Sequence, residues 1–431
     1  MKTCVVALGK IGLPLAVQIA SKGREVIGVD VDERVVDLVN RGEVPFPGEA
    51  DLDARLAAAV EGGCLRATTD TAAAVADSDT VVLVVPLVVD DRAEPDFAAL
   101  DAATRSVAKG LQPGTLVSYE TTLPVHTTRT RFTPMLADLA GLEPGVDLFV
   151  CHSPERVYSG RIFSDLRRYP KLVGGIEPAS AERAVRFYSS VLDFDDRPDL
   201  ARPNGVWDLG SAEAAELAKL VETTYRDVNI ALANEFAVHA DALGVDVYEV
   251  IGAANSQPFS HVHRPGIAVG GHCIPVYPRF YLSGHRDARL PATGRTVNEG
   301  MPDYAVGRLA ERLGTLRGAT VAVLGAAYRG GVKETAFSGV FPTVAALEAH
   351  GAMAQVHDPL YDDAELMALG PTPYHLGGAC DAAILQADHA SYRELGPQDL
   401  PGVRVLLDGR AFTDPHRWAG VDRVVIGSPS R

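Results

Sequence analysis

The sequence predicts an α/β protein with two doubly wound domains joined by a long helix, and three observations indicate this fold. Short β-branched runs alternate with helical patterns from residue 3 to about 150, as in CVVAL, EVIGVD, TVVLVV, GTLVSY and DLFVC. A second alternation begins at Ala319 with TVAVLGAAYRGG. Between the two sets, residues 211–243 contain neither glycine nor proline. Alternating strands and helices are typical of βαβ units and a parallel sheet.

The strand-like runs of the first set are separated by helical stretches such as LDARLAAAV and FAALDAATRSVAKGL. The longest apolar run, residues 81–89, contains Pro86 and is predicted to be a buried parallel strand. It is far shorter than the ~20 apolar residues that cross a bilayer. We therefore expect no membrane-spanning segment and no membrane partner.

Residues 211–243 are predicted to form one helix of roughly 50 Å that bridges the two domains. The following stretch, residues 256–278, has almost no regular periodicity and is expected to be a structured loop, where functional residues tend to gather. We divide the chain into residues 1–205, a central helical part at 206–300, and residues 301–431.

Composition narrows the function classes. A net charge of −16 over 431 residues would repel phosphate backbones, which argues against a nucleic-acid partner. The five cysteines are scattered and form no CxxC pair, so neither a disulfide framework nor a zinc site is expected, and no metal is predicted. Free cysteines are typical of a reducing cytosol, and a cytoplasmic protein is expected.

The first strand runs into a glycine-bearing turn, ALGKIG at residues 7–12. Gly9 and Gly12 fit a loop that lets a dinucleotide pyrophosphate approach a helix N-terminus, although Ala7 stands where a first glycine is usual. Asp30 follows the second strand, where a carboxylate bonds the ribose 2′-hydroxyl and repels a 2′-phosphate. The sequence therefore favours NAD over NADP, the alternative being a simple βα turn.

A similar loop, GAAYRGG at residues 325–331, follows the first strand of the second set. Arg329 and Lys333 lie in or near it, and the next strand ends in HDP. These basic groups suit a diphosphate-bearing substrate better than a second cofactor. The alternative is a solvated loop.

Cys273 lies in VGGHCIP, where Gly270 and Gly271 leave backbone room for a ligand. Three histidines and Arg264 lie close in sequence, a setting that lowers a thiol pKa from ~8.5. A nucleophilic thiol beside NAD predicts four-electron oxidation of an alcohol through a thiohemiacetal and a thioester, with two NAD consumed per substrate. The remaining cysteines are interpreted as buried small hydrophobic residues: Cys4, Cys64, Cys151 and Cys380.

Several spaced motifs together carry a family resemblance that covers essentially the whole chain: LGKIGLPLA, VIGVD, ETTLPV, HSPERV, AKLVETTYRDVNIALANE, GGHCIPV and VLGAAYRGGVKET. The chain resembles the UDP-glucose / UDP-N-acetylmannosamine dehydrogenase family of nucleotide-sugar 6-dehydrogenases, and RDVNIALANE and SPERV resemble the UDP-N-acetylmannosamine branch. The resemblance implies two Rossmann-like domains, a helical linker that forms a homodimer core, and oxidation of a UDP-sugar, most specifically a UDP-N-acetylhexosamine, to its uronate.

The same resemblance implies roles for matching residues. Cys273 would be the nucleophile, and Lys219 would stabilise an alkoxide or oxyanion. Glu155 would act as general base or hold the hydrolytic water, and Thr122 would place that water or contact the nicotinamide. The expected cofactor-binding residues are Gly9, Lys10, Ile11, Gly12, Asp30, Arg34, Pro86 and Thr122. The expected substrate-binding residues are Arg156, Val157, Thr223, Arg264, Gly270, Gly271, Tyr277, Tyr328 and Arg329.

Four positions depart from the family pattern. Tyr277 and Thr223 replace an Asp and an Asn near the catalytic cysteine and lysine, while Phe259 and Ala336 replace two arginines. Either Tyr277, Arg264 and Lys333 take over these tasks or the sugar differs from the usual ones. Simpler roles also exist: a solvated helix position for Lys219, a cap or ion-pair role for Glu155, and a turn position for Thr122.

Three alternative functions stay open from the sequence. The first is a UDP-glucose or GDP-mannose 6-dehydrogenase. The second is a two-electron dehydrogenase of the 3-hydroxyacid or 6-phosphogluconate type, which would release one NADH per substrate and would give the GGHC segment no task. The third is an NAD-binding sensor without activity, motivated by Tyr277, Phe259 and Ala336.

Overall fold

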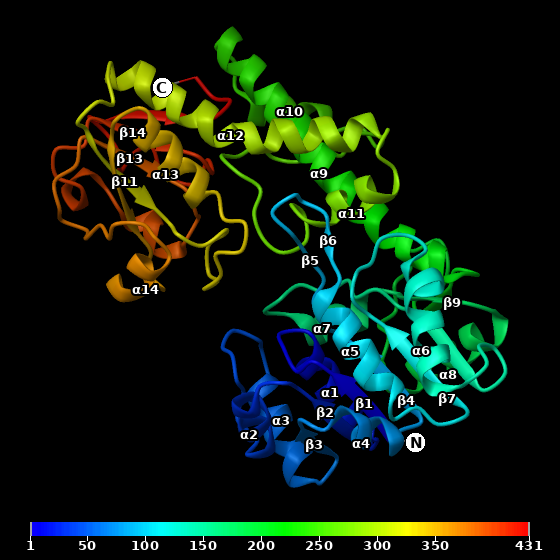
Figure 1. Ribbon diagram of the computed structural model, residues 1–431. Helices are drawn as coiled ribbons and strands as arrows, with labels where there is room; N and C mark the ends of the chain where they lie inside the picture. The colour runs from blue at the N-terminus through cyan, green and yellow to red at the C-terminus, as the bar shows by residue number, and fades with distance from the viewer. Residues whose placement is uncertain (1, 430–431) are drawn as a thin grey trace. The chain divides into compact units, whose positions relative to one another are not determined.

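A computed structural model describes residues 2–429 of the chain. The chain divides into two compact units, which Figure 1 shows with the N-terminal unit in blue to green. Unit 1 contains the residues up to 222 together with 279–284, and unit 2 contains residues 223–278 and those from 285 onward. The α/β class with two parallel sheets is confirmed.

The sheet of unit 1 is parallel except where β8 meets β9, in the order β10-β9-β8-β7-β4-β1-β2-β3. Its central strands are continuous apolar runs because both faces are buried. The strands are β1 (Lys2–Val6), β2 (Glu25–Val29), β3 (Leu65–Thr68), β4 (Thr80–Leu83), β7 (Thr115–Tyr119), β8 (Leu148–His152), β9 (Lys171–Gly175) and β10 (Val206–Asp208).

Helices flank this sheet (Figure 1), and the first of them is buried along its whole length. It packs with apolar residues of the central strands into the main core of unit 1. The helices are α1 (Gly12–Ala20), α2 (Glu33–Asn40), α3 (Leu52–Glu61), α4 (Thr71–Ala76), α5 (Ala98–Ala108), a π-helical turn (Thr128–Phe132), α6 (Thr133–Ala140), α7 (Ile162–Arg168) and α8 (Pro178–Val191).

Unit 2 contains a five-stranded parallel sheet in the order β12-β11-β13-β14-β15. Its core joins the apolar faces of these strands to the later turns of α9 and to α12. The elements are β11 (Thr320–Leu324), α13 (Val340–Ala349), β12 (Met353–His357), α14 (Asp363–Ala368), β13 (Ala382–Leu385), two 3₁₀ turns (Ala390–Glu394 and Pro397–Asp399), β14 (Val405–Asp408) and β15 (Asp422–Val425).

The long helix expected at residues 211–243 is confirmed as α9 (Ala212–Leu243), which contributes residues to both units. It is followed by α10 (Val247–Ala254), and no helix or strand interrupts residues 255–276 before α11 (Tyr277–Gly284). The irregular loop predicted there is thus confirmed. A second long helix, α12 (Arg289–Leu313), was not predicted, because Pro302 and three glycines interrupt its pattern.

One expected strand is wrong. Residues 81–89 do not form a single strand: β4 ends at Leu83, and Val88 lies in the hairpin of β5 (Val88–Val89) and β6 (Pro95–Asp96). Pro86 has no backbone N–H to continue a ladder, so the chain leaves the sheet there, and Val88 is half exposed. Among residues 2–429, no helix is long and apolar enough to cross a membrane.

Candidate functional site

The turn after β1 is shaped for close backbone approach. A Cβ added to Gly12 would lie 1.9 Å from the Ala7 carbonyl oxygen, so only glycine fits as the first residue of α1. A Cβ at Gly9 would meet nothing within 4 Å, so this side of the turn is open. Ala7 has φ of 77°, in the left-handed region that favours glycine. The turn therefore has the glycine-type geometry that its sequence only partly shows.

Asp30 follows β2 and braces this turn. Its Oδ2 accepts the Leu8 N–H at 2.8 Å and its Oδ1 accepts the Asp32 N–H at 3.0 Å. Val31, beside it, is 94% exposed, so the carboxylate borders open space. The open turn, the N-terminus of α1 and this carboxylate fit the diphosphate and ribose of a dinucleotide.

The other expected cofactor residues lie along the same edge of the sheet. β7, β4, β1 and β2 are adjacent and parallel, so the segments that follow them meet at their carboxyl ends. Pro86 follows β4, and Thr122, buried, follows β7. The Thr121 hydroxyl donates to the Val85 carbonyl at 2.6 Å, which joins these two segments. Lys10 and Ile11 lie in the turn after β1, and exposed Arg34 is the second residue of α2.

Two carboxylates of α9 join the helix to the segments after β7 and β8. Buried Glu216 accepts the backbone N–H groups of His126 and Thr128 at 2.7 and 2.8 Å. Glu222 Oε2 accepts a hydrogen bond from Arg156 Nε at 3.0 Å. Lys219 lies midway between them and is 7% exposed. Residues three apart share a helix face, so Lys219 faces the region of the two segments and is not the solvated residue of the simpler alternative.

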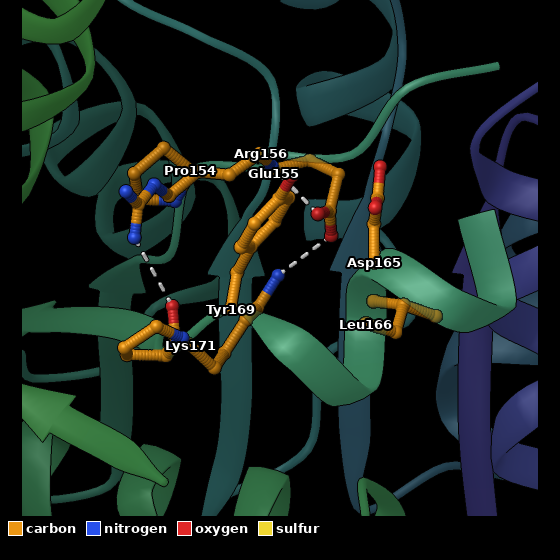
Figure 2. A pocket seen from close by; sticks show the side chains of 8 residues that line it. Pro154, Glu155, Arg156, Asp165, Leu166, Tyr169 and Lys171 are labelled. Carbon is orange, nitrogen blue, oxygen red and sulfur yellow. Dashed lines mark hydrogen bonds and ion pairs between the residues drawn. The ribbon is translucent and has the colours of Figure 1, made fainter. Parts of the chain in front are cut away.

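Glu155 follows β8 in a buried ionic cluster (Figure 2). Its Oε1 accepts the Arg156 N–H at 2.6 Å, and its Oε2 lies 2.9 Å from Lys171 Nζ. Lys171 Nζ also donates to Glu120 Oε2 at 2.6 Å, and the Tyr188 hydroxyl donates to Glu120 Oε1 at 2.6 Å. Lys171 is 5% exposed and Glu120 1% exposed. One buried ammonium group therefore bridges two carboxylates.

The cluster divides the two carboxylates electrostatically. Burial raises the pKa of Glu120 to about 7, against the attraction of Lys171. Burial also acts to raise the pKa of Glu155, but Lys171 and the hydrogen bonds outweigh it and the net direction is downward. The arrangement keeps Glu155 anionic, as a general base must be.

Arg156 and Val157, both expected at the substrate, have protein partners. The Arg156 guanidinium donates to Glu222 and to the Pro170 carbonyl at 3.3 Å, and Val157 packs against the main core of unit 1. Both residues lie beside Glu155 in sequence. Their contact with substrate stays a prediction.

In unit 2, the loop that carries Cys273 is anchored by two asparagines of α9. The Asn229 side chain accepts the His263 N–H at 2.9 Å and donates to the His261 carbonyl at 2.7 Å. Buried Asn234 accepts the Gly266 N–H at 3.0 Å. The motif RDVNIALANE thus holds the start of the loop in place.

The end of the loop packs on the segment after β11. A Cβ on Gly270 would lie 2.6 Å from Tyr328 Cβ, and Gly271, with φ of 93°, lies against the Tyr328 ring. The Gly271 N–H donates to the Ala336 carbonyl at 2.8 Å. The structure therefore brings together three residues expected at the substrate, and position 336 contributes its backbone.

Cys273 is exposed, and its carbonyl accepts the N–H of Tyr277, the first residue of α11, at 2.9 Å. Cys4, Cys151 and Cys380 are buried as expected, whereas Cys64 is only half-buried. Burial raises the pKa of the Cys4 thiol, and that of the Cys151 thiol, to about 12. Thiols of this kind stay protonated and inert at neutral pH.

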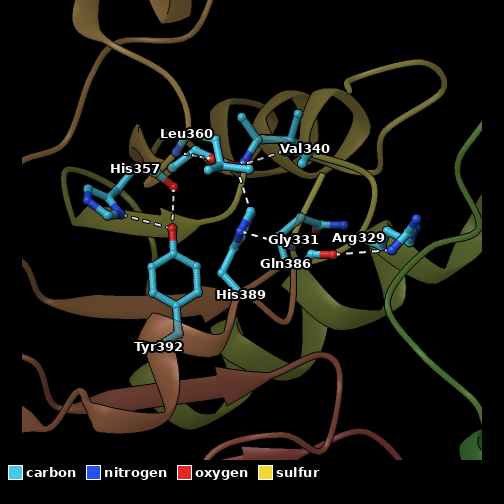
Figure 3. Close-up of polar contacts among 12 residues, drawn as sticks. Arg329, Gly331, Val340, His357, Leu360, Gln386, His389 and Tyr392 are labelled. Carbon is cyan, nitrogen blue, oxygen red and sulfur yellow. Dashed lines mark hydrogen bonds and ion pairs between the residues drawn. The ribbon is translucent and has the colours of Figure 1, made fainter. Parts of the chain in front are cut away.

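The segment that carries Tyr328 and Arg329 is fixed by a polar network (Figure 3). Asp358, after β12, accepts the Ala326 and Ala327 N–H groups at 2.8 and 3.0 Å and lies 3.1 Å from His389 Nε2. His389 Nδ1 lies 3.3 Å from the Gly331 nitrogen, so it is the acceptor and Nε2 carries the proton.

Half-buried Arg410 completes this network by donating to the carbonyls of Tyr328 and Gln386, both at 2.9 Å. The Arg329 guanidinium lies half-buried beside the Tyr328 hydroxyl, with a 3.3 Å contact. The network fixes the backbone from which these two side chains project.

Two basic residues expected to compensate for the four departures from the family pattern contact other protein side chains. Lys333 pairs with Glu365 of α14, and Arg264 lies over the Tyr248 ring at 5.2 Å. Phe259 is 91% exposed, and Thr223 on α9 is buried. No basic side chain is thus seen to replace the missing arginines among these positions.

Five residues around the site were not predicted from the sequence: Lys171, Glu120, Glu216, Asn229 and Asn234. A lysine opening the strand KLVGG, two glutamates in apolar surroundings and two asparagines inside a long helix were the available signals, because such residues are rarely buried without partners. Among residues 2–429 no group of three or more His, Cys, Asp or Glu side chains forms a metal-binding cluster.

Comparison with protein families covers most of the chain in three consecutive parts. Residues 1–192 match the NAD binding domain of the UDP-glucose/GDP-mannose dehydrogenase family, residues 213–299 its central domain, and residues 322–415 its UDP binding domain.

Individual relatives agree. UDP-N-acetyl-D-mannosamine dehydrogenase of Pyrococcus horikoshii is 36% identical over 424 residues, with 95% of each chain covered. NDP-N-acetyl-D-galactosaminuronic acid dehydrogenase of Ralstonia nicotianae is 33% identical, covering 96% of this chain and 97% of that one. The solved P. horikoshii structure superposes with a TM-score of 0.88 at 33% identity, covering 99% of both chains.

A UDP-glucose dehydrogenase structure from Pyrobaculum islandicum superposes with a TM-score of 0.87 at 26% identity, covering 100% of this chain and 98% of that one. These matches and the dinucleotide turn confirm NAD as the expected cofactor. The chain belongs to the UDP-glucose/GDP-mannose dehydrogenase family and is an NAD-dependent nucleotide-sugar dehydrogenase.

Proposed function

We propose that the protein oxidises the C6 alcohol of a UDP-N-acetylhexosamine to the carboxylate in a four-electron reaction. The observation that carries this proposal is the exposed Cys273 thiol on a loop that α9 and the Tyr328 segment hold in place. A two-electron dehydrogenase has no use for such a thiol, whereas a covalent thioester requires one.

In the proposed mechanism the turn after β1 and Asp30 would hold NAD, which when bound would supply the hydride acceptor for the two oxidations at C6. Cys273 attacks the C6 aldehyde to form a thiohemiacetal, which becomes a thioester on the second oxidation. Lys219 donates to the developing alkoxide and oxyanion. Glu155 takes a proton from the water that releases the uronate, and Thr122 orients that water.

The nucleotide is assigned to the segment after β11. Arg329 would pair with a phosphate oxygen, and the Tyr328 ring beside Gly271 would line the binding surface. The fixed backbone around Asp358 and His389 supports this assignment, since a rigid segment loses little conformational entropy on binding. Within this proposal, residues 1–205, 206–300 and 301–431 serve as cofactor, central and nucleotide parts.

The N-acetylhexosamine is inferred from the relatives. Two of those at 33–36% identity carry names with N-acetylated hexosamines, from P. horikoshii and R. nicotianae. The missing arginine at position 259, where an exposed Phe stands, is compatible with a sugar other than glucose. We therefore rank UDP-glucose below a UDP-N-acetylhexosamine as the candidate substrate.

A direct test is NADH formation with UDP-ManNAc, UDP-GlcNAc, UDP-GalNAc, UDP-glucose and GDP-mannose. We expect turnover with an N-acetylated UDP-hexosamine and two NADH per molecule consumed at the end point. One NADH per molecule would instead support a two-electron dehydrogenase. Cys273→Ser is expected to lose more than nine-tenths of the rate, and Cys64→Ser, a change at a half-buried thiol outside the loop, serves as its control.

The protein is also proposed to be a homodimer through α9 and α10 of unit 2. Apolar side chains on these two helices and in the turn between them are 39–60% exposed, and exposed apolar surface is typical of an interface: Tyr225, Leu232, Phe236, Val238, Leu243, Val245 and Val250. Light scattering should give twice the chain mass, and Phe236→Asp should give a folded monomer. A monomeric wild-type protein would contradict the proposal.

A further inference from the structure

The buried cluster beneath Glu155 has no task in the mechanism above. Its members come from three neighbouring strand ends: Glu120 follows β7, Glu155 follows β8, and Lys171 opens β9. The Glu155 N–H donates to the Glu120 carbonyl at 3.2 Å, so the segments after β7 and β8 are joined through the backbone as well. The sheet itself therefore sets the spacing of the three charges.

The cluster is unusual because a buried ammonium group faces two carboxylates. Charges of this kind are costly to bury, and a structural purpose alone is served as well by apolar side chains of similar volume. The Glu120 carboxylate is fully enclosed, with both oxygens engaged by Lys171 and Tyr188. Glu155, by contrast, keeps 13% of its side chain exposed, so only this end of the cluster meets solvent.

The Glu155 carboxylate is held at both of its oxygens. One carboxylate oxygen is fixed by the Arg156 N–H and the other by Lys171 Nζ. Figure 2 shows the ammonium group pointing from β9 toward Glu155, on the side opposite the Arg156 guanidinium. Without Lys171 the carboxylate would lose its only salt-bridge partner among the described residues and would lie in a desolvated position beside Glu120.

Other titratable and charged groups also face this position. Asp165 of α7 and Tyr169 line the same small pocket as Glu155. The Asp165 carboxylate is engaged by the Tyr158 N–H at 3.0 Å and by Arg161 at 3.1 Å, and the Arg156 guanidinium is engaged by Glu222. Buried His152 lies at the end of β8, and burial lowers its pKa to about 3, so it carries no charge. Lys171 is thus the cation that acts directly on Glu155.

We propose that Lys171 is a positioning residue that holds Glu155 oriented and anionic as the base of the hydrolytic step, with Glu120 as the buried counter-charge that holds Lys171. This inference rests on the role of Glu155 in the proposed function. Glu120 anchors Lys171 from the protein side, so that the ammonium group cannot swing out to solvent, and Tyr188 fixes Glu120 in turn. The expected consequence is a pH dependence of the rate that belongs to Glu155 but is set by Lys171.

The test compares kcat and KM across acid and neutral pH for the full-length wild type, Lys171→Arg, Lys171→Met and the double variant Glu120→Gln/Lys171→Met. Loss of the cation should raise the pKa of Glu155, so the acid limb of kcat should move to higher pH by about one unit or more in both Met variants. Lys171→Arg should keep the limb near its wild-type position, and the KM for NAD should stay within about twofold in every variant, because no contact of the cofactor turn changes.

The double variant keeps the proposal testable if Lys171→Met alone does not fold. Lys171→Met alone leaves two buried carboxylates face to face, which is strongly destabilising, whereas removing both buried charges is much less so. Glu120→Gln alone is the matched control, because the amide oxygen of the glutamine can still accept the Lys171 hydrogen bond and the Lys171–Glu155 pair is kept; its acid limb should not move to higher pH. A folded double variant whose acid limb stays at the wild-type position would overturn the proposal.

Glu155→Gln separates the inference from the proposed function. If Glu155→Gln keeps the wild-type rate, Glu155 is not the base and both the role assigned to it and the inference fail. If Glu155→Gln is inactive while the acid limb of the folded Met variants does not move, only the inference fails. A uniform loss of kcat at every pH, without movement of the limb, would show that Lys171 is merely structural and would also overturn the proposal.

Discussion

The two sheets of the protein share one arrangement of a turn and an acidic residue, but the arrangement has a different role in each sheet. Ala7 follows β1 and Gly325 follows β11, and both have positive φ, 77° and 111°. Asp30 follows β2 and Asp358 follows β12, and each carboxylate accepts an N–H group from the turn of the neighbouring strand. The turn, the acid and the strand order around them correspond.

The difference lies in what else each carboxylate binds. Asp30 is half-buried and borders the exposed Val31, so it retains lone pairs toward open space. Asp358 is 3% exposed, and its carboxylate accepts hydrogen bonds from two turn N–H groups, from the Leu360 N–H and from His389. Sheet topology alone therefore does not decide whether such an acid binds a ligand or holds the protein together.

The largest effect is expected from Asp358→Ala. The change leaves several buried donors without their acceptor, and we expect the free energy of unfolding to fall by about 3–5 kcal/mol. Urea unfolding followed by circular dichroism measures this loss. NAD affinity of the folded protein should be unchanged, since unit 1 keeps all its contacts. A loss below about 1 kcal/mol would contradict the structural role assigned to Asp358.

The corresponding change in the other sheet, Asp30→Ala, should act on the cofactor instead. Loss of a charged hydrogen bond of about 2 kcal/mol predicts that the NAD dissociation constant rises roughly 30-fold. Discrimination against NADP should weaken as well, because the repelling carboxylate is gone. Calorimetric titration of both cofactors measures this. An Asp30→Ala protein that binds NAD as tightly as the wild type would show that Asp30 does not contribute to cofactor binding, and would contradict the difference assigned to the two carboxylates.

The pH dependence of stability tests the role assigned to the charge of Asp358. Burial acts to raise the pKa of Asp358, but hydrogen bonds from His389 and from backbone N–H groups outweigh it and lower the pKa. An acid with a depressed pKa stabilises the fold above its unfolded pKa of about 3.9, and this contribution is lost as pH falls through the folded pKa.

The difference in unfolding free energy between wild type and Asp358→Ala should therefore narrow as pH is lowered below about 4. It should narrow only partly, because a protonated carboxyl still accepts hydrogen bonds. Denaturant titrations of both proteins at neutral and acid pH measure the change. A difference that stays constant down to the acid limit would contradict the role assigned to the charge.

Much of the fold could be predicted because it depends on local pattern. The central strands are apolar runs bounded by turns, and α9 is a long stretch without Gly or Pro. α12 could not be predicted in the same way, because Pro302 and Gly294 lie inside it. A Cβ at Gly294 would come within 3.3 Å of Val228 on α9, so this glycine serves a close helix contact that no local pattern shows.

The site was predictable where a motif marks the chemistry and not where partners meet through the sheet. The turn after β1, Asp30 and the Cys273 loop carry their own signals. Lys171 lies 51 residues from Glu120 and 16 from Glu155, and only the antiparallel pairing of β9 with β8 places it beside them. Such a cluster depends on strand register, which the sequence of either strand alone does not specify.

The smallest expected effect concerns the first residue of the two turns. Ala7 adopts a left-handed φ that costs a non-glycine residue about 1–2 kcal/mol, whereas Gly325 meets the same demand without strain. Ala7→Gly also gains freedom in the unfolded chain, which offsets part of the relief, so we expect a net stabilisation of about 0.5–1 kcal/mol.

Thermal unfolding should show a higher Tm for Ala7→Gly, with NAD affinity retained, because the Ala7 N–H still donates to the Val29 carbonyl. The mirror change, Gly325→Ala, should act in the opposite direction and more strongly, since the new Cβ would lie 2.5 Å from Ala387 Cβ. A destabilised Ala7→Gly protein would mean that the side chain at position 7 contributes more by packing than its backbone conformation costs. The two turns would then share a backbone conformation but differ in whether side-chain packing or backbone strain has the larger effect on stability.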